Sequence, residues 1–253
     1  MNRLEISSDM IKWIKDYCED NGIKSLVVGV SGGIDSALTS TLSAMTGLPT
    51  YVISMPIYQN KTQLLRARNH IQWLVEEYDY VTFIEKDLTS VFESLVSTLS
   101  EDEQSELSLA NSRARLRMTM LYQLASIHGG IVVGTGNRVE DFGVGFYTKY
   151  GDGGVDISPI ADLTKTEVRE IAGYLGVDEE IVNAAPTDGL WEDGRTDEEQ
   201  LGASYEELEW AMDYYGSVKD LTDRQKEVIK IYNKHHTQNK HKMIPIPVFK
   251  VKR

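Results

Sequence analysis

The chain has 253 residues, of which 41% are apolar and 26% are charged, and its formal net charge is −13. This is the composition of a globular protein with room for one large α/β domain or two small domains, and it excludes disorder. The acidic balance disfavours a nucleic-acid partner, because a field of that sign repels phosphate backbones. Apolar runs stay far below the roughly 20 residues that a membrane span needs, so we expect no membrane partner.

Cysteine usage and the first residues bear on the location of the protein. Cys18 is the only cysteine, which excludes an intrachain disulfide and a cysteine-based metal cluster. The first ten residues hold no apolar stretch of the signal-peptide kind, so we expect no such peptide. Both features fit a reducing compartment, and we expect a cytoplasmic protein.

Short apolar runs alternate with helical patterns along the chain, which predicts βαβ units and a parallel sheet covered by helices on both faces. We find no internal repeat and no linker, so we expect one domain over residues 1–253, with helical additions at the C-terminal end. The expected elements are, in order, a helix at 9–20, a strand at 25–30, a helix after Gly33, a strand at 50–55, a helix at 61–78, a strand at 80–85, helices at 87–99 and 109–128, a strand at 131–135, a Gly-rich stretch at 141–156, helices at 164–175 and 178–184, a loop at 186–200, helices at 204–214 and 222–234, and an extended tail at 243–251.

The clearest motif is the glycine-rich segment at residues 29–36, between the first predicted strand and the helix that follows it. Adjacent glycines let the backbone turn tightly and approach a ligand, and the free N–H groups that open a helix attract an anion. The motif is neither a Walker A loop nor a GxGxxG fingerprint. A carboxylate beside phosphate would be repulsive, and a bridging Mg²⁺ resolves that conflict at Asp35. The alternative is a capped helix after a turn. The candidate phosphate site comprises Gly29, Val30, Ser31, Gly32, Gly33, Ile34, Asp35 and Ser36.

This loop resembles the pyrophosphate-binding loop of the N-type ATP pyrophosphatases, which cleave ATP between the α and β phosphates and adenylate a substrate. Later motifs narrow the resemblance to the ammonia-dependent NAD synthetases. These motifs are ARLRM (114–118), GTGNRVED (134–141), FYTKYGDGGVDISPI (146–160), LTK (163–165), APTDGLW (185–191), TDEEQLGASYEEL (196–208) and HK (241–242).

The resemblance implies a fold, an assembly and a reaction. The fold is a doubly wound open parallel sheet with helices on both faces, of the adenine nucleotide alpha hydrolase-like kind, and the assembly is a homodimer. The reaction converts deamido-NAD, ATP and ammonia into NAD, AMP and diphosphate with Mg²⁺, through an adenylated nicotinate carboxylate. No covalent nucleophile is needed. We expect no glutaminase domain, since the resemblance uses almost the whole chain, and infer that ammonia is free or delivered by a partner.

The resemblance also implies roles for single residues. The local pattern alone favours a capping threonine at Thr135, solvated side chains at Glu140 and Lys165, and a turn at Thr187. Met243 stands where the family usually has arginine. At ATP the resemblance places Thr135, Lys165 and Thr187 beside the glycine loop; at Mg²⁺ it places Asp35 and Glu140; and at deamido-NAD it places Arg115, Lys149, Asp156, His241 and Lys242.

Two other functions stay open. One is another adenylating enzyme of the same superfamily acting on a different substrate, a nucleotide or a tRNA; sulfur chemistry on tRNA usually needs more cysteines than Cys18, and the acidic charge argues against a tRNA. The other is a nucleotide sensor without turnover, which would need the glycine loop but not the paired carboxylates. Release of diphosphate on addition of deamido-NAD and ammonia separates these functions.

Overall fold

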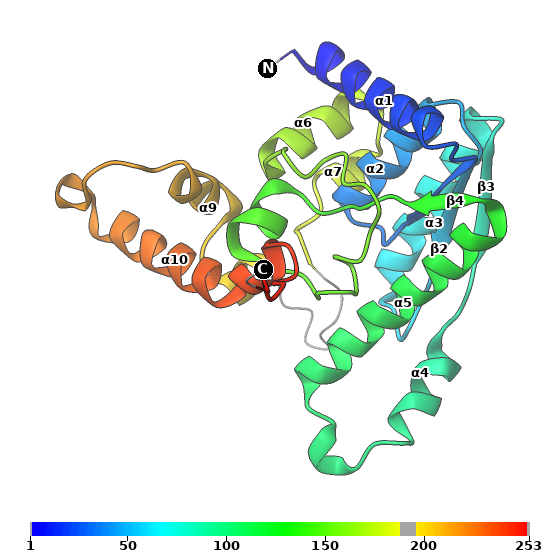
Figure 1. Ribbon diagram of the computed structural model, residues 1–253. Coiled ribbons are helices and arrows are strands. Elements are labelled where there is room, and N and C mark those ends of the chain that lie inside the picture. Colours follow the sequence, from blue (N-terminus) through cyan, green and yellow to red (C-terminus); the bar gives the residue numbers. More distant parts are fainter. Residues whose placement is uncertain (1, 188–195, 252–253) are drawn as a thin grey trace.

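A four-stranded parallel sheet forms the centre of the molecule (Figure 1). The computed structural model describes residues 2–187 and 196–251. The strands lie in the order β3-β2-β1-β4, and each neighbouring pair is parallel. Their bounds are β1 (Ser25–Gly29), β2 (Thr50–Ser54), β3 (Val81–Glu85) and β4 (Gly130–Val132).

Helices cover both faces of this sheet, as the alternation of apolar runs predicts. Alternate residues of a strand point to opposite faces. Leu26 and Val28 of β1 are buried against one layer of helices, whereas Val27 is buried against the other, beside Leu124. The first layer contains α1 (Arg3–Asp20), α2 (Ile34–Met45) and α6 (Lys165–Tyr174). The second layer contains α4 (Thr89–Val96) and α5 (Glu106–His128). The remaining helix, α3 (Lys61–Glu77), packs on β2 and β3.

The sheet is doubly wound, which confirms the predicted fold class. The chain passes from β1 outward to β2 and β3, and then returns across the sheet so that β4 pairs with the other side of β1. Ligands in open α/β sheets bind at such a reversal, beyond the carboxyl ends of the strands. The glycine loop after β1 and the residues that follow β4 therefore meet at one crevice.

The C-terminal elements form a unit of their own beside the sheet (Figure 1). It contains α8 (Asp197–Leu201), α9 (Tyr205–Met212), η3 (Val218–Asp220) and α10 (Asp223–Met243), and it packs on η2 (Val139–Val144), a short π-helical segment. The short elements η1 (Glu101–Glu103) and α7 (Glu179–Val182) complete the described chain. Within residues 2–187 and 196–251 no helix is both long and apolar enough to span a bilayer.

Several elements differ in length from their predictions. The first helix begins at Arg3, because the Asn2 side chain accepts the Glu5 N–H and caps it. The last helix runs to Met243, so His241 and Lys242 lie on its final turn, just before the tail. A segment expected to be a loop holds η2, and the predicted 186–200 loop contains α8.

Candidate active site

The glycine loop joins β1 to α2 and adopts the tight turn that its sequence predicts. Gly32 has φ +88°, a left-handed conformation that favours glycine, and Gly33 is the N-cap of α2. The hydroxyl of Ser36 donates to the Gly33 carbonyl at 2.9 Å, and the Ser31 N–H donates to the Ser36 hydroxyl at 3.1 Å. The loop is thus held by its own hydroxyls, and the N-terminus of a buried helix opens beside it, which suits a phosphate group.

Close approach of another helix explains why Gly32 in particular is glycine. A Cβ added at Gly32 would lie 2.3 Å from the backbone oxygen of Gln63 in α3, closer than any real contact. A Cβ added at Gly33 would meet only the Ser31 hydroxyl, at 3.4 Å. Gly32 therefore serves the packing of the loop on α3, whereas Gly33 leaves open space on the side where an anion would lie.

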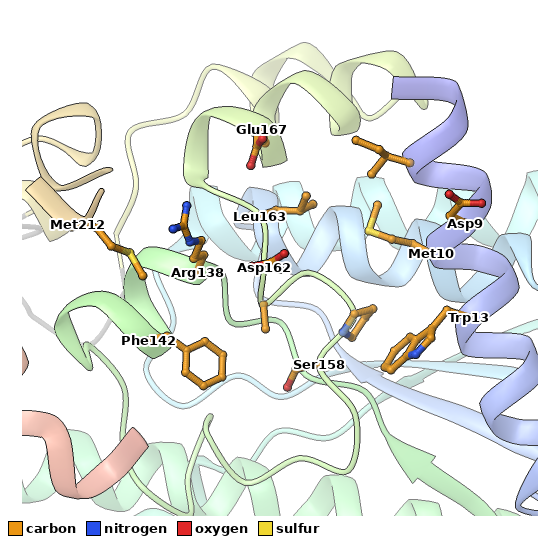
Figure 2. Close-up of a pocket in the computed structure, with 13 residues that line it drawn as sticks. Asp9, Met10, Trp13, Arg138, Phe142, Ser158, Asp162, Leu163, Glu167 and Met212 are labelled. Atoms are coloured by element: carbon orange, nitrogen blue, oxygen red, sulfur yellow. The ribbon is translucent and has the colours of Figure 1, made fainter. Parts of the chain in front are cut away.

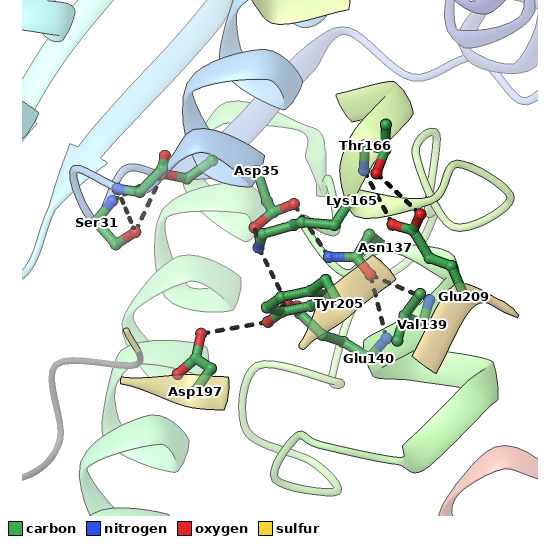
Figure 3. A network of polar contacts seen from close by, with 12 residues as sticks. Ser31, Asp35, Asn137, Val139, Glu140, Lys165, Thr166, Asp197, Tyr205 and Glu209 are labelled. Carbon is green, nitrogen blue, oxygen red and sulfur yellow. Dashed lines mark hydrogen bonds and ion pairs between the residues drawn. The ribbon is translucent and has the colours of Figure 1, made fainter. Parts of the chain in front are cut away.

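Three charged side chains from distant parts of the chain meet next to this loop (Figure 3). The Lys165 ammonium lies 2.5 Å from Oδ2 of Asp35 and 3.0 Å from Oε1 of Glu140. Asp35 lies in the first turn of α2, Glu140 in η2, and Lys165 opens α6. The lysine side chain is 3% exposed and each carboxylate is 16% exposed. The structure thus brings together both predicted magnesium ligands and one predicted ATP ligand.

The protonation of this cluster follows from burial and from the opposite charges within it. Burial alone would lower the pKa of Lys165, but the two carboxylates outweigh it and the pKa lies above its usual value. Burial is likewise outweighed at Glu140, where Lys165 and the Tyr205 hydroxyl lower the pKa. At Asp35 burial dominates and, with the charge of Glu140, raises the pKa. The Lys165 side chain is therefore positively charged, and it forms ion pairs with both carboxylates.

Sequence reasoning missed three residues that complete this cluster. Asn137, which is fully buried, donates to Asp35 at 3.2 Å and accepts the N–H groups of Val139 and Glu140 at 3.1 Å. The Tyr205 hydroxyl lies 2.5 Å from Oε1 of Glu140 and 3.3 Å from Asp197 (Figure 3). An asparagine before a helical turn is a recognisable cap signal. The capping box around Ser204 places Tyr205 at a helix start but does not reveal its partner.

The two predicted threonines lie in different settings. Thr135 is half-buried and follows β4 closely, at the crevice where the strands end. Thr187 is half-buried and is the last residue described before the gap in the chain. The next motif residues, 188–191, lie outside the described residues. The Asp197 N–H donates to the carbonyl of Pro186 at 3.0 Å, so the two ends of this connection lie together.

A second group of predicted residues gathers around the loop at 145–151. The Lys149 ammonium donates to the His241 carbonyl at 2.8 Å, and Arg115 donates to the Lys149 carbonyl at 3.4 Å. The Lys242 ammonium donates to the carbonyls of Gly145 and Tyr147, each at 2.8 Å. Four of the five residues predicted at deamido-NAD therefore converge, from α5, the loop and the last turn of α10.

Asp156, the fifth, lies at a different place. Its carboxylate accepts the Val132 N–H at 2.8 Å and the Tyr122 hydroxyl at 3.0 Å, which ties the segment after the loop to β4 and α5. Burial, together with this carboxylate, raises the pKa of Tyr122 to about 12, so the phenol is a donor at neutral pH. Asp156 is nonetheless exposed.

Met243, where the resemblance leads us to expect arginine, packs against Gly145. A Cβ added at Gly145 would lie 2.8 Å from the Met243 methyl and 2.4 Å from Cβ of Asn239, so α10 packs closely on this glycine. Gly145 also has φ +65°. An apolar residue at 243 therefore fits this contact.

The carboxylates allow a test of whether the crevice suits Mg²⁺. Among the described residues no three His, Cys, Asp or Glu side chains converge as a metal cage would require. Asp35 and Glu140 do converge on one cation, the Lys165 ammonium. Mg²⁺ in phosphate sites takes one or two carboxylates and completes its shell with phosphate oxygens and waters. The donor set fits a magnesium ion bound together with a phosphate ligand.

A cavity of about 710 Å³ is lined by residues of α1, η2 and α6 (Figure 2). Trp13 and Phe142 form part of its wall, and Arg138 in its rim is paired with Asp213 at 2.5 Å. None of the predicted site residues lines this cavity. The cluster, unlike this cavity, joins a helix N-terminus, a buried cation and paired carboxylates.

Comparison with known protein families and relatives agrees with the geometry. The family model described as NAD synthase matches residues 6–252. A relative from Carboxydothermus hydrogenoformans, an NH(3)-dependent NAD(+) synthetase, is 39% identical over 214 residues, which is 83% of this chain and 85% of the relative.

Solved structures give the same picture. An NMN synthetase from Francisella tularensis is 30% identical, with a TM-score of 0.89, over 99% of this chain and 100% of that chain. An NH3-dependent NAD synthetase from Campylobacter jejuni is 23% identical, with a TM-score of 0.81, over 99% of this chain and 100% of that chain. The second of these likenesses concerns the fold alone.

Proposed function

The chain belongs to the NAD synthase family, so it is a ligase that forms a carbon–nitrogen bond in ammonia-dependent NAD synthesis, and we propose that the crevice at the glycine loop is its reaction centre. One observation carries this proposal. A buried ammonium and two carboxylates, from Lys165, Asp35 and Glu140, meet beside a helix N-terminus at the switch point of the sheet. Such a site suits a triphosphate and its counter-ions.

The reaction has two steps. An oxygen of the nicotinate carboxylate attacks the α-phosphorus of ATP, and the bond to diphosphate breaks. The nitrogen of ammonia then attacks the acyl carbon, the bond to AMP breaks, and a proton is released. Neither step needs an enzyme nucleophile, so the work of the chain is to position the reactants and stabilise charge.

Each group in the crevice has a part in this scheme. The amides at the start of α2 and the hydroxyl of Ser31 bind the departing diphosphate, and Ser36 holds the loop through its bond to Gly33. The positive charge of Lys165 stabilises the negative charge that develops on the leaving diphosphate. Asp35 and Glu140 would hold Mg²⁺, which supplies neutralisation of the phosphate charge. Thr135 and Thr187 contact the nucleotide in this proposal.

The dinucleotide is proposed to lie along the loop at 145–151. The cationic groups of Arg115, Lys149 and Lys242 surround this loop, and deamido-NAD carries a negatively charged diphosphate and a carboxylate. His241 lies on the same turn of α10. The Asp156 carboxylate already accepts hydrogen bonds from Tyr122 and Val132. In this proposal Asp156 therefore helps to bind deamido-NAD by fixing the chain segment that follows the loop.

Product analysis tests the proposal. The full chain is incubated with deamido-NAD, ATP, Mg²⁺ and ammonium, and the nucleotides are separated by chromatography. We expect NAD, AMP and diphosphate in equal amounts. Accumulation of ADP in place of AMP would reject cleavage between the α and β phosphates, and binding of ATP without turnover would indicate a sensor.

A second candidate substrate is favoured by the likeness to the NMN synthetase. NMN is the half of NAD that carries the nicotinamide, so its acid is the half of deamido-NAD that carries the carboxylate. The chemistry at the carboxylate is the same for both, and only contacts to the adenylyl half distinguish them. Measuring kcat/KM for each of the two acids identifies the preferred substrate, which is the acid with the higher value.

The proposal also covers the oligomeric state, the domain organisation, the nitrogen donor and the location of the enzyme. We propose a homodimer, one synthetase domain over residues 1–253, and ammonia as the nitrogen donor. Light scattering tests the dimer, and comparison of ammonium with glutamine as donor tests the last point. An ATP-consuming enzyme with one buried cysteine fits the cytoplasm.

A further inference from the structure

Tyr205 is a tyrosine whose ring is fixed by packing. It opens α9 and is 1% exposed. Its neighbours in the core of the C-terminal unit include Val139, Val144 and Leu208, each fully buried. A ring held from several sides has little rotational freedom, so its hydroxyl occupies one defined position.

That hydroxyl points at the carboxylate of Glu140 (Figure 3). It lies 2.5 Å from Oε1 of Glu140 and 3.3 Å from Oδ2 of Asp197. A phenol has one proton to donate, and the shorter distance assigns that proton to Glu140. A hydrogen bond from a neutral donor to a buried carboxylate is among the stronger kinds.

The same carboxylate oxygen also accepts from Lys165, at 3.0 Å. The lysine ammonium lies 4.8 Å from the centre of the Tyr205 ring, close enough for a cation–π interaction. Both donors therefore hold Oε1, and the carboxylate is fixed in the direction of Lys165 and Asp35. The backbone N–H of Glu140 is held separately, by Asn137.

We infer that Tyr205 is a positioning residue, which holds the Glu140 carboxylate in the orientation that binds a divalent cation. The inference rests on the proposed function, in which Glu140 is a metal ligand. Groups that bind the ligands of a metal orient them, and their loss typically weakens metal affinity about 10–100-fold. Tyr205 belongs to the C-terminal unit, so that unit contributes directly to the metal site.

The substitution Tyr205→Phe tests this role in the full chain, because it keeps the ring and removes only the hydroxyl. Mn²⁺ binding is measured from the electron paramagnetic resonance signal of free Mn²⁺, with α,β-methylene-ATP as a nucleotide that cannot be cleaved. We expect about 10–100-fold weaker Mn²⁺ binding. The Mg²⁺ concentration that gives half-maximal rate rises in parallel.

Tyr214→Phe is the matched control. The Tyr214 hydroxyl donates to the Ser217 carbonyl at 2.8 Å at an exposed site, so this variant also loses one hydroxyl and one hydrogen bond. Its Mn²⁺ affinity should equal that of the unaltered chain. The thermal unfolding midpoint of both variants separates loss of packing from loss of metal binding.

The outcomes separate the inference from the proposed function. A lower unfolding midpoint with unchanged Mn²⁺ affinity in Tyr205→Phe would make Tyr205 a packing residue only and overturn the inference. Glu140→Gln is measured alongside. If it abolishes Mn²⁺ binding while Tyr205→Phe has no effect, the inference alone fails. If Glu140→Gln binds Mn²⁺ normally, the proposed metal role of Glu140 fails, and the inference with it.

Discussion

The ammonium of Lys165 lies 2.5 Å from Oδ2 of Asp35, although 130 positions separate the two residues in the sequence. The lysine side chain is almost fully buried, and Glu140 shares its charge. A protein cation thus occupies the point where two carboxylates converge. Removing one partner of a buried ion pair is costly, because the remaining charge is left uncompensated.

We predict that Lys165→Met destabilises the enzyme and that a divalent cation restores part of the loss. Without divalent cations the free energy of unfolding should fall by about 3–5 kcal/mol, since two buried carboxylates then repel each other. Added Mg²⁺ should stabilise the variant more than the unaltered chain, because a metal ion can replace the missing charge. Urea denaturation with and without Mg²⁺ measures both effects.

A lysine far from this cluster provides the control. Lys15 is exposed on α1, and Lys15→Met should change neither stability nor its response to Mg²⁺. An equal Mg²⁺ response in Lys165→Met and the unaltered chain would mean that the carboxylates do not bind the metal.

Two adjacent glycines should respond differently to the same substitution. Gly32→Ala forces a side chain into a left-handed backbone, at a cost of roughly 1–2 kcal/mol, and also into the Gln63 backbone. Its unfolding midpoint should fall clearly. Gly33→Ala meets only a side-chain oxygen and should keep its stability. In the proposed site its methyl would crowd the phosphate, so ATP binding should weaken. Thermal unfolding and ATP titration of both variants check this; equal stability would contradict the packing role of Gly32.

Lys149→Ala should weaken deamido-NAD binding far more than ATP binding. The lysine lies in the second group of cations and not beside the glycine loop, and loss of a hydrogen bond from a charged group is worth about 1.5–3 kcal/mol. We therefore expect KM for deamido-NAD to rise on the order of 10–100-fold. Steady-state kinetics with each substrate varied measures this. Lys240→Ala, at an exposed lysine next to His241 on α10, is the control. Equal losses for both substrates in Lys149→Ala would show that its assignment is misplaced.

Local pattern and sheet topology predicted that the glycine loop lies at the carboxyl edge of the sheet, but not the contacts made there. A buried strand, two glycines and a helix placed Asp35 at the sheet edge, and Glu140 follows the strand that ends beside it. The bonds of Lys165 and Tyr205 to these carboxylates join segments that are 130 and 65 positions apart. The first contact depends on how α6 packs beside α2, and the second on how the C-terminal unit packs on η2. No local signal in the sequence specifies either packing.

The end of α10 shows another limit of sequence patterns. Its last turns lack apolar periodicity, so the predicted helix ends at residue 234. The structure extends it to Met243 because polar side chains replace the missing apolar face. His236, Asn239 and Lys242 bind the carbonyls of Gly143, Val144 and Gly145. A helix stabilised by hydrogen bonds to a loop leaves no periodic signal in the sequence.

Burial of His70 gives the protein a pH-dependent stability away from the active site. His70 in α3 is 2% exposed, and its Nε2 lies 2.9 Å from the Ser40 hydroxyl. Because Ser40 donates to the Ala37 carbonyl, the network assigns the ring proton to Nε2. Burial lowers the pKa of His70 from 6.5 to about 4, since the charged ring would be desolvated.

Acidification should weaken the contribution of His70 to stability. Between pH 6.5 and pH 4 the unfolded chain binds a proton at His70 that the folded chain does not, so the His70 contribution to the free energy of unfolding falls as pH falls. The expected loss from His70 between pH 7 and pH 5 is about 2 kcal/mol. Urea denaturation at both pH values measures it, and His70→Gln should be less stable at pH 7 but lose about 2 kcal/mol less on acidification. The same pH dependence in both proteins would show that His70 is protonated within the fold.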